Sequence, residues 1–322
     1  MKRVVSISLG SSKRDHKVEA EFLGEKFVIE RIGTDGDMER AIQMIKELDG
    51  KVDAFGMGGI DLYLVAGNKR YPIREAKKIA AAAKKTPIVD GSGLKNTLER
   101  RVIDYLQQEL GWDFKGKRAL VVVGVDRFGI AEALWDAGCK TTYGDLIFSL
   151  GIPIPIHKLS TLRNLAYILL PILSQLPFKM LYPTGEKQDT VNTKHEHYYQ
   201  NNDIIAGDFH FIRKYMPQEL PGKIIITNTV TKDDIELLRQ RGVGVLVTTT
   251  PEMDGRSFGT NVLEGVLISL LGKRVDEVEA EDYNNLLDQL QLKPRVVYLQ
   301  DEQPNSSTDG KKPVKDPVTG AN

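Results

Sequence analysis

The sequence predicts an α/β protein with a C-terminal doubly wound, Rossmann-like parallel sheet, preceded by a smaller α/β domain with an N-terminal hairpin. Two observations carry this prediction. Short apolar runs alternate with helical patterns along most of the chain, which is typical of parallel sheets. The segment 118–145 reads as strand, glycine turn, helix, strand and acid, which is the layout of a dinucleotide-binding βαβ unit.

The first domain, residues 1–112, is expected to be a small α/β unit that binds the substrate. Two segments that alternate apolar and polar residues flank a Gly-Glu turn, and they predict the hairpin. Helices are expected where apolar residues recur at helical spacing. The predicted elements are strands at 4–9, 17–23, 26–32, 52–57 and 87–89, and helices over 38–48, 74–84 and 94–110.

The second domain, residues 113–300, is expected to be the Rossmann-like domain, closed by a helix over 262–271. The tail, residues 301–322, is rich in polar residues and poor in apolar ones, so we expect it to be disordered. The predicted strands of the second domain lie at 119–123, 140–143, 179–182, 203–206, 223–227 and 244–248.

Composition excludes several classes of function. The 322 residues include 44 basic and 44 acidic side chains, so no net charge favours binding to nucleic acid. The single cysteine, Cys139, excludes an intrachain disulfide, fits a reducing cytoplasm and is expected to be a packed structural thiol. The apolar stretch 162–176 is interrupted and too short for a membrane span. We therefore expect a cytoplasmic protein with a small-molecule substrate, and the sequence leaves a homo-oligomer open.

The glycine turn matches the G-x-G-x-x-G fingerprint in part. Gly124 and Gly129 hold its first and third positions, but Asp126 holds the second, where a carboxylate repels a pyrophosphate. Arg127 supplies a compensating positive charge. Asp145 follows Gly124 by 21 residues, near the spacing of the acid that binds the ribose hydroxyls, and it favours NAD over NADP. The alternative is an ordinary βα turn that binds no nucleotide.

Ionisable residues gather where strands of the first domain end. Asp61 and Asp90 follow neighbouring strands, and Lys95 follows a glycine-flanked turn at a helix start. A lysine there is at the unfavourable end of the helix dipole, and when desolvated it can act as a general acid or base. The alternative is that Asp90 or Ser92 caps the helix while Lys95 is solvated.

The loops of the second domain supply candidate binding residues. Arg256 and Asn261 precede a helix N-terminus, which attracts anions, so we assign them to the substrate, although Asn261 can also simply cap the helix. Thr249, at a strand end, is assigned to the cofactor. Asp208 and His210 alternate along a segment read as extended, and His210 is expected to donate to a substrate oxygen.

No metal site is expected. The His195-x-His197 pair has no further ligand spaced to complete a site, and we expect both side chains to be solvated. The loop Gly10–Arg14 is similar to a phosphate cradle but lacks the P-loop spacing, so it is only a weak candidate for an anion site.

Across nearly the whole folded part, the chain resembles a bacterial family labelled quinate 5-dehydrogenase. The resemblance implies NAD(P)-dependent oxidation of a polyhydroxy cyclohexane carboxylate to its 5-keto form. The better understood shikimate and quinate dehydrogenases pair a lysine with an aspartate in a cleft between two α/β domains, and Lys95 occupies a comparable place. The carrying motifs are VSISLGSSKRDHKVEAEFLG, FGMGGIDLYL, VDGSGLKNTLERR, VGVDRFGIAEAL, IAGDFHFIRKYMP and TTTPEMDGRSFGTNVLE.

Three functions follow from these residues. In an NAD-dependent dehydrogenase of a hydroxylated carboxylate such as quinate or shikimate, Arg256 holds the carboxylate and Lys95 with Asp61 or Asp90 moves the hydroxyl proton. A non-redox lyase or transferase uses the same cleft on an anionic metabolite without a nicotinamide. A metabolite-binding protein with a dehydrogenase-like fold binds without turnover, and the carboxylate of Asp126 favours it.

Overall fold

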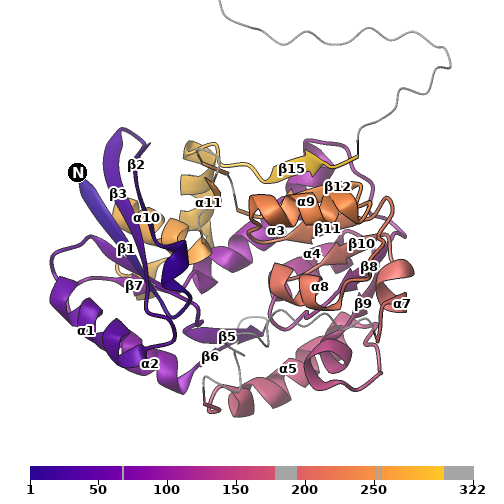
Figure 1. Cartoon of the computed structure of the whole chain (residues 1–322), viewed down its shortest axis with the longest axis horizontal. Helices are drawn as coiled ribbons and strands as arrows, with labels where there is room; N and C mark the ends of the chain where they lie inside the picture. Colours follow the sequence, from indigo (N-terminus) through magenta and orange to yellow (C-terminus); the bar gives the residue numbers. More distant parts are fainter. Residues whose placement is uncertain (67–68, 178–193, 251, 254–255, 258, 301–322) are drawn as a thin grey trace, which may run out of the picture.

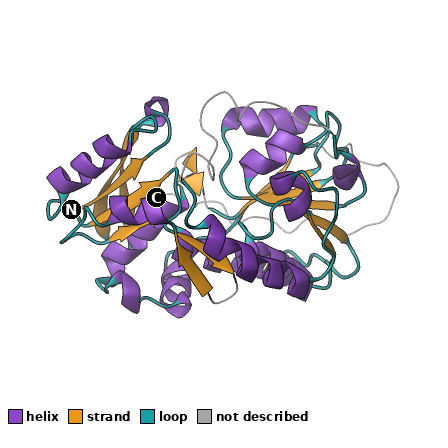
Figure 2. Cartoon of the chain, turned by 90° about the horizontal axis from the view of Figure 1, so that it is seen from below, coloured by secondary structure: helices purple, strands orange, loops and turns teal. Residues whose placement is uncertain are grey.

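The computed structural model shows two α/β lobes, each built on its own sheet (Figure 1). Figure 2, turned by a right angle, shows the same two lobes lying next to each other. This confirms the predicted fold class, with an N-terminal mixed sheet that carries a hairpin and a mostly parallel second sheet. The structure describes residues 1–66, 69–177, 194–250, 252–253, 256–257 and 259–300.

The sheet of the first lobe has the strand order β2-β3-β1-β4-β7. Its central strand β1 is paired in parallel on both sides, so that Val4 lies between Ile29 and Ala54. The predicted hairpin is confirmed, because β2 and β3 are antiparallel neighbours. The strands are β1 (Lys2–Ser8), β2 (His16–Phe22), β3 (Glu25–Gly33), β4 (Ala54–Gly58) and β7 (Ile88–Val89).

Helices cover both faces of this first sheet. The helices α1 (Met38–Leu48) and α2 (Arg74–Ala80) bury their apolar residues against one face, in a core that includes Phe55. The other face is covered by α10 (Thr260–Leu271), whose Val262 joins the second core. The sequence analysis placed this helix in the second domain, and that placement is wrong because its apolar face packs on β1 and β4.

The second sheet has the strand order β15-β12-β11-β10-β8-β9, and β15 alone runs antiparallel to its neighbour. Large apolar cores lie on both of its faces, as expected for a doubly wound sheet. The predicted strand 179–182 lies outside the described residues. The strands are β8 (Arg118–Val121), β9 (Lys140–Tyr143), β10 (Ile204–Ala206), β11 (Ile224–Thr227), β12 (Val245–Thr248) and β15 (Arg295–Tyr298).

The chain passes between the lobes more than once. Helix α3 (Ser92–Gln108) leaves the first lobe and packs against α4 (Phe128–Asp136) of the second. After β12, the chain returns through α10 and α11 (Ala280–Gln289) to pack on the first sheet and on α3, and β15 then rejoins the second sheet. The two lobes are therefore interleaved in sequence.

A second hairpin joins the lobes. Strands β5 (Tyr63–Ala66) and β6 (Lys69–Pro72) pack against α5 (Leu159–Leu173) of the second lobe, where Leu64 lies in one cluster with Leu170. The remaining elements are η1 (Ser12–Arg14), the π-helical turn η2 (Asp145–Ser149), α7 (His197–Gln200), α8 (Phe209–Tyr215), α9 (Lys232–Gln240), β13 (Glu252–Met253), β14 (Arg256–Ser257) and η4 (Val275–Glu277).

Two expectations about the chain as a whole can be compared with the structure. Within the described residues, no helix combines the length and apolar character needed to cross a membrane. Cys139 is buried, and burial raises the pKa of its thiol to about 11. A thiol with so high a pKa is a poor nucleophile, in keeping with the structural role predicted for it.

Candidate functional site

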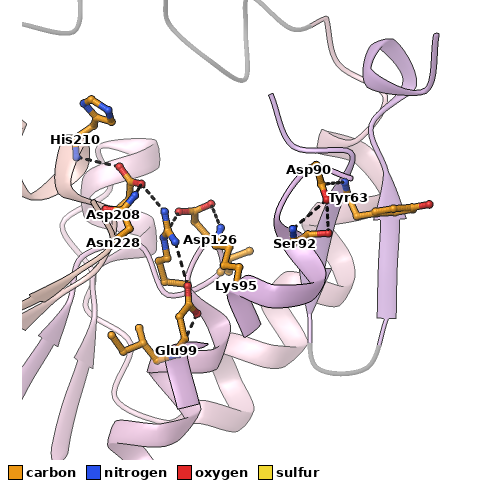
Figure 3. A network of polar contacts seen from close by, with 12 residues as sticks. Tyr63, Asp90, Ser92, Lys95, Glu99, Asp126, Asp208, His210 and Asn228 are labelled. Carbon is orange, nitrogen blue, oxygen red and sulfur yellow. Dashed lines mark hydrogen bonds and ion pairs between the residues drawn. The ribbon is translucent and has the colours of Figure 1, made fainter. Parts of the chain in front are cut away.

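A group of six charged residues lies where the two lobes meet, and we call it the interlobe cluster; Figure 3 labels its members Lys95, Glu99, Asp126 and Asp208. Helix α3 brings two members from the first lobe, and the loops after β8 and β10 bring three from the second. One further member follows β4. The cluster consists of Asp61, Lys95, Glu99, Asp126, Arg127 and Asp208.

Lys95 and Asp126 form the ion pair that connects the lobes at this point. The Nζ atom of Lys95 lies 3.1 Å from Oδ1 of Asp126. Burial and the nearby Arg127 lower the pKa of Lys95, but Asp126, Asp61 and Glu99 outweigh them, so that its pKa is raised above the ordinary value. Lys95 is therefore protonated at neutral pH and available as an acid.

Asp61 is a third ionisable residue that lies close to this ion pair. Burial raises the pKa of its carboxyl to about 6, with Asp126 and Asp90 adding to the shift and Lys95 opposing it. The sequence analysis offered Asp61 or Asp90 as the partner of Lys95. The structure brings Asp61, Lys95 and Asp126 together around one cavity.

The cavity between the lobes has a volume of about 30 Å³. It holds about one water molecule, whereas sites for small molecules usually span roughly 300–1,000 Å³. A ligand of ordinary size therefore does not fit the cavity in the arrangement of this structure. The cavity is lined by Asp61, Tyr63, Leu64, Val65, Ser92, Lys95, Asn96, Glu99, Val125, Asp126 and Phe128.

Asp90 is engaged in hydrogen bonds with the backbone near the start of α3, and its predicted catalytic role stays a prediction. Its carboxylate accepts hydrogen bonds from the backbone N–H of Leu62 at 2.5 Å and from the N–H and hydroxyl of Ser92 at 3.0 and 2.7 Å. These contacts join the start of α3 to the loop that carries Asp61. Asp90 thus positions the loop of Asp61, whereas the N-cap residue of α3 is Gly91 and has no side-chain cap.

Arg127 is the centre of the cluster. It precedes the first residue of α4, and its guanidinium lies 3.2 Å from Glu99, 3.2 Å from Asp126 and 2.5 Å from Asp208. Only about a tenth of the side chain is exposed. Burial lowers the pKa of Arg127, but the three carboxylates raise it by more than burial lowers it. The pKa of Arg127 therefore lies above its ordinary value. The sequence predicts that this charge compensates for Asp126 beside a pyrophosphate. In the structure it holds carboxylates from three segments together.

Glu99 occupies the N-terminus of α4. Its Oε2 accepts a hydrogen bond of 3.2 Å from the backbone N–H of Ile130, in the first turn of that helix. The glutamate is almost fully buried, and burial raises the pKa of its carboxyl against the opposing effects of Arg127 and Lys95. A helix N-terminus in this position is where a dinucleotide domain binds its pyrophosphate. Here a carboxylate of the chain takes that place.

Asp145 engages the other donors of the glycine loop. Its carboxylate accepts from the backbone N–H of Gly124 at 3.0 Å and from that of Val125 at 2.8 Å. The side chain is buried, and burial raises its pKa to about 6, even though these backbone hydrogen bonds lower it. Asp145 therefore anchors the loop, and its predicted contact with ribose hydroxyls stays a prediction.

These contacts test whether a dinucleotide fits the glycine loop. The backbone donors of Gly124, Val125 and Ile130 are all satisfied by carboxylates of the chain. Gly129 lies against α3, where an added Cβ would come within 3.0 Å of the carbonyl oxygen of Asn96. In this arrangement the loop does not fit a pyrophosphate, because carboxylates of the chain occupy its backbone donors and α3 packs against Gly129.

We expect Gly129→Ala to destabilise the protein by about 2 kcal/mol, because the new methyl group meets α3 at sub-van-der-Waals distance in a packed region. Urea unfolding of the purified variant measures this change. Since the strain comes from the interlobe packing, the loss should be the same with and without NAD. An unchanged midpoint would show that α3 lies farther from α4 than the structure places it.

Thr249 and Asn261 are not among the described residues that line the cavity. Thr249 is buried, and its backbone N–H donates to the carbonyl oxygen of Thr227. Asn261 donates from Nδ2 to the hydroxyl of Ser6 at 2.8 Å, so it connects α10 to the first sheet. The backbone of Arg256 belongs to β14, and its side chain lies outside the described part of the chain.

Asp208 and His210 are not on an extended strand. Asp208 is the N-cap of α8, and its side chain accepts from the backbone N–H of His210, which is exposed in the first turn of that helix. The prediction failed because a capping aspartate and a strand end look alike in sequence. Among the described residues, no group of three or more His, Cys, Asp or Glu side chains is arranged to hold a metal ion.

Sequence reasoning missed a buried pair behind the site. Glu264 of α10 accepts a hydrogen bond of 2.6 Å from the hydroxyl of Tyr283 of α11. Burial raises the pKa of this carboxyl to about 7. The pair lies against Gly93 in the first turn of α3, where an added Cβ would meet Glu264 at 2.5 Å. The feature of the sequence that could have indicated this pair is Glu264, a glutamate within the apolar run of a helix.

The chain belongs to the family described as domain of unknown function DUF8754, which matches residues 93–299. Residues 3–90 match a second domain of unknown function, DUF8753. The two matches meet just before α3, whereas the predicted domain boundary follows that helix. No curated protein matches the chain.

Several solved structures are similar to the chain at low identity. A galactofuranose binding protein is 13% identical, with a TM-score of 0.36, over 90% of this chain and 99% of its own. An NAD-dependent malic enzyme from Thermotoga maritima is 12% identical, with a TM-score of 0.36, over 90% and 84%. L-tryptophan dehydrogenase from Nostoc punctiforme is 12% identical, with a TM-score of 0.38, over 90% and 80%. Their names cover both enzymes and binding proteins.

Proposed function

We propose that this chain is an enzyme that moves protons on a small polar metabolite bound between its two lobes. One observation carries the proposal: Lys95 and Asp61 of the first lobe and Asp126 of the second line a single cavity. In open α/β sheets, ligands bind beyond the carboxyl ends of the strands, and Asp61 and Asp126 follow β4 and β8 at such ends.

The two titrating groups have complementary roles. Asp61, with a pKa of about 6, is largely ionised at neutral pH and yet basic enough to accept a proton from a hydroxyl or an activated carbon. Lys95 stays protonated, so it donates a proton or stabilises the negative charge that develops on an oxygen. A group that accepts a proton beside a group that donates one is the arrangement that general acid–base catalysis requires.

A second candidate is the NAD(P)-dependent oxidation of a hydroxylated carboxylate such as quinate or shikimate. It is favoured by the position of Lys95 and Asp61 between two α/β lobes, as expected from the resemblance to quinate 5-dehydrogenases. It is disfavoured by the carboxylates of Glu99 and Asp145 at the glycine loop. NAD binding, which the sequence predicts ahead of NADP, therefore requires these groups to move.

The test is a turnover screen in D₂O followed by NMR. The full-length protein is incubated with a panel of hydroxylated and oxo metabolites, including quinate, shikimate and amino alcohols, without nicotinamide and with NAD or NADP. For any substrate found, Lys95→Met should reduce the rate by roughly 10²–10⁴-fold, because it removes the proton donor. Lys273→Met, which removes an exposed lysine of an ion pair with Asp282, is the matched control and should keep the rate.

The outcomes separate the candidates. Lys95-dependent proton exchange or conversion without nicotinamide supports the non-redox enzyme, whether lyase or transferase. Conversion only with NAD or NADP supports the dehydrogenase. Binding of a metabolite with no turnover under any condition contradicts both and identifies a metabolite-binding protein.

A further inference from the structure

We propose that Glu264 and Tyr283, the buried pair behind the start of α3, are positioning residues that hold Lys95 in place for proton transfer. The inference rests on the proposed function, since it concerns the placement of its proton donor. Neither side chain of the pair is among the described residues that line the cavity. The pair therefore acts through the backbone of α3 rather than by touching a ligand.

The first turn of α3 packs directly against this pair. The hydroxyl of Tyr283 donates a hydrogen bond of 2.6 Å to Oε1 of Glu264, and both side chains are buried. At Gly93 no side chain separates the helix from the pair, because an added Cβ would lie 2.5 Å from Oε1 of Glu264 and 3.0 Å from the hydroxyl of Tyr283. In so closely packed a region, a shift of the pair displaces the helix start.

Gly91 connects the pair to Lys95 along the backbone. Its carbonyl oxygen accepts a hydrogen bond of 2.8 Å from the backbone N–H of Lys95. Burial raises the pKa of Glu264, and the backbone of Gly91 is near enough to this carboxyl group to lower it in turn. One residue of the helix start is thus in contact with the support on one side and with the proton donor on the other.

Asp90 connects the same helix start to the proton acceptor of the proposed reaction. Its carboxylate accepts from the backbone N–H of Ser92 at 3.0 Å and from that of Leu62, the residue after Asp61, at 2.5 Å. A displacement of the helix start would therefore reach the loop of Asp61 as well as Lys95. The buried pair supports the point from which both groups are held.

The position of Lys95 matters because its Nζ atom bridges the lobes. Figure 3 shows this side chain extending from α3 to Asp126, at a distance of 3.1 Å. A misplacement of about 1 Å can reduce a reaction rate on the order of 100-fold. Apolar side chains could fill the space behind α3, but a hydrogen-bonded carboxyl group fixes direction as well as distance.

The test measures the reactivity of Lys95 itself, so it needs no substrate. The folded full-length protein is labelled at pH 7.5 with trace acetic anhydride, and mass spectrometry gives the rate at Lys95 relative to that at Lys46, an exposed lysine of α1. We expect Tyr283→Phe to raise this relative rate about threefold or more, because losing the hydrogen bond loosens the helix start and the ion pair with Asp126.

Further variants separate positioning from stability. Tyr199→Phe removes another buried hydroxyl, which donates at 3.2 Å to the carbonyl oxygen of Ile212 in the second lobe. It should lower the unfolding midpoint in urea much as Tyr283→Phe does and leave the relative rate at Lys95 unchanged. Glu264→Gln keeps an oxygen that accepts from Tyr283 and should stay within about twofold of wild type, whereas Glu264→Leu should raise the rate as Tyr283→Phe does.

For any substrate that the turnover screen identifies, Tyr283→Phe should lower kcat about tenfold and change KM by less than about twofold, since the pair places the donor and does not contact the ligand. A relative rate at Lys95 that Tyr283→Phe leaves unchanged, or that Tyr199→Phe raises equally, would overturn the inference and leave the proposed function standing. A raised rate in Tyr283→Phe together with turnover that Lys95→Met does not affect would sustain the positioning of Lys95 and contradict the proposed function.

Discussion

Replacing Arg127 by methionine should lower the free energy of unfolding by about 4 kcal/mol at neutral pH. The guanidinium is the shared partner of Glu99, Asp126 and Asp208. Glu99 is only 2% exposed, so the substitution leaves a buried carboxylate without its main counter-charge. Breaking a buried ion pair from one side typically costs roughly 3–5 kcal/mol, which is a large part of the stability of a domain. Urea unfolding at pH 7.5 measures the change.

Two companion variants sharpen this measurement. Arg274→Met removes an arginine of an exposed ion pair with Asp276 and should change stability by no more than about 0.5 kcal/mol. Adding Glu99→Gln to the Arg127→Met variant should recover part of the loss, because the stranded charge disappears. A loss below about 1 kcal/mol for Arg127→Met would mean that the cluster is hydrated rather than buried.

Glu264→Gln should remove a pH dependence of stability that the wild-type protein shows between about pH 4.5 and 8. The folded pKa of Glu264 is raised from its ordinary value of 4.5 to about 7, with burial as the main cause. A raised carboxyl pKa gives stability that is fully present below pH 4.5 and is lost as the pH rises through 7. A shift of this size corresponds to about 3 kcal/mol.

The measurement is urea unfolding at pH 5 and at pH 8.5. Between these two values, wild-type stability should fall by more than that of Glu264→Gln, with the difference approaching the 3 kcal/mol above. Asp61 and Asp145, with pKa values of about 6, contribute the same sign in both proteins. The control Glu47→Gln, at an exposed site on α1, should behave like wild type. Parallel pH profiles for wild type and Glu264→Gln would contradict the burial of this carboxyl.

Much of the fold could be predicted because buried strands and helices show a periodic pattern of apolar residues in the sequence. The alternation in residues 17–23 and 26–32 predicted the hairpin, and the apolar run before Gly124 predicted β8. The short edge strand β15 has no such trace and was missed. Helix α10 was predicted but assigned to the wrong lobe, because the apolar pattern of a helix does not indicate which sheet the helix covers.

The site could be predicted in part. Strand ends pointed to Asp61 and Lys95, and the mismatch in the glycine fingerprint pointed to Asp126, which the structure pairs with Lys95. Glu99 was missed, although it follows Lys95 by one helical turn on the face of α3 that also buries Val102. A glutamate in that register is the signal that could have found it. The contacts of Asp145 could be found only in the structure, because spacing in the sequence does not distinguish an acid that binds ribose from one that anchors the loop.

The repeated crossing of the chain between the lobes limits how this protein can be divided or recombined. One covering layer of the first sheet is α10, which begins about 200 residues after β4 ends. A gene cut after α3 would release a sheet with an apolar face open to solvent and hence prone to aggregate. The two lobes therefore cannot be exchanged independently. Replacing either lobe with that of a homologue requires replacing its distant helices as well.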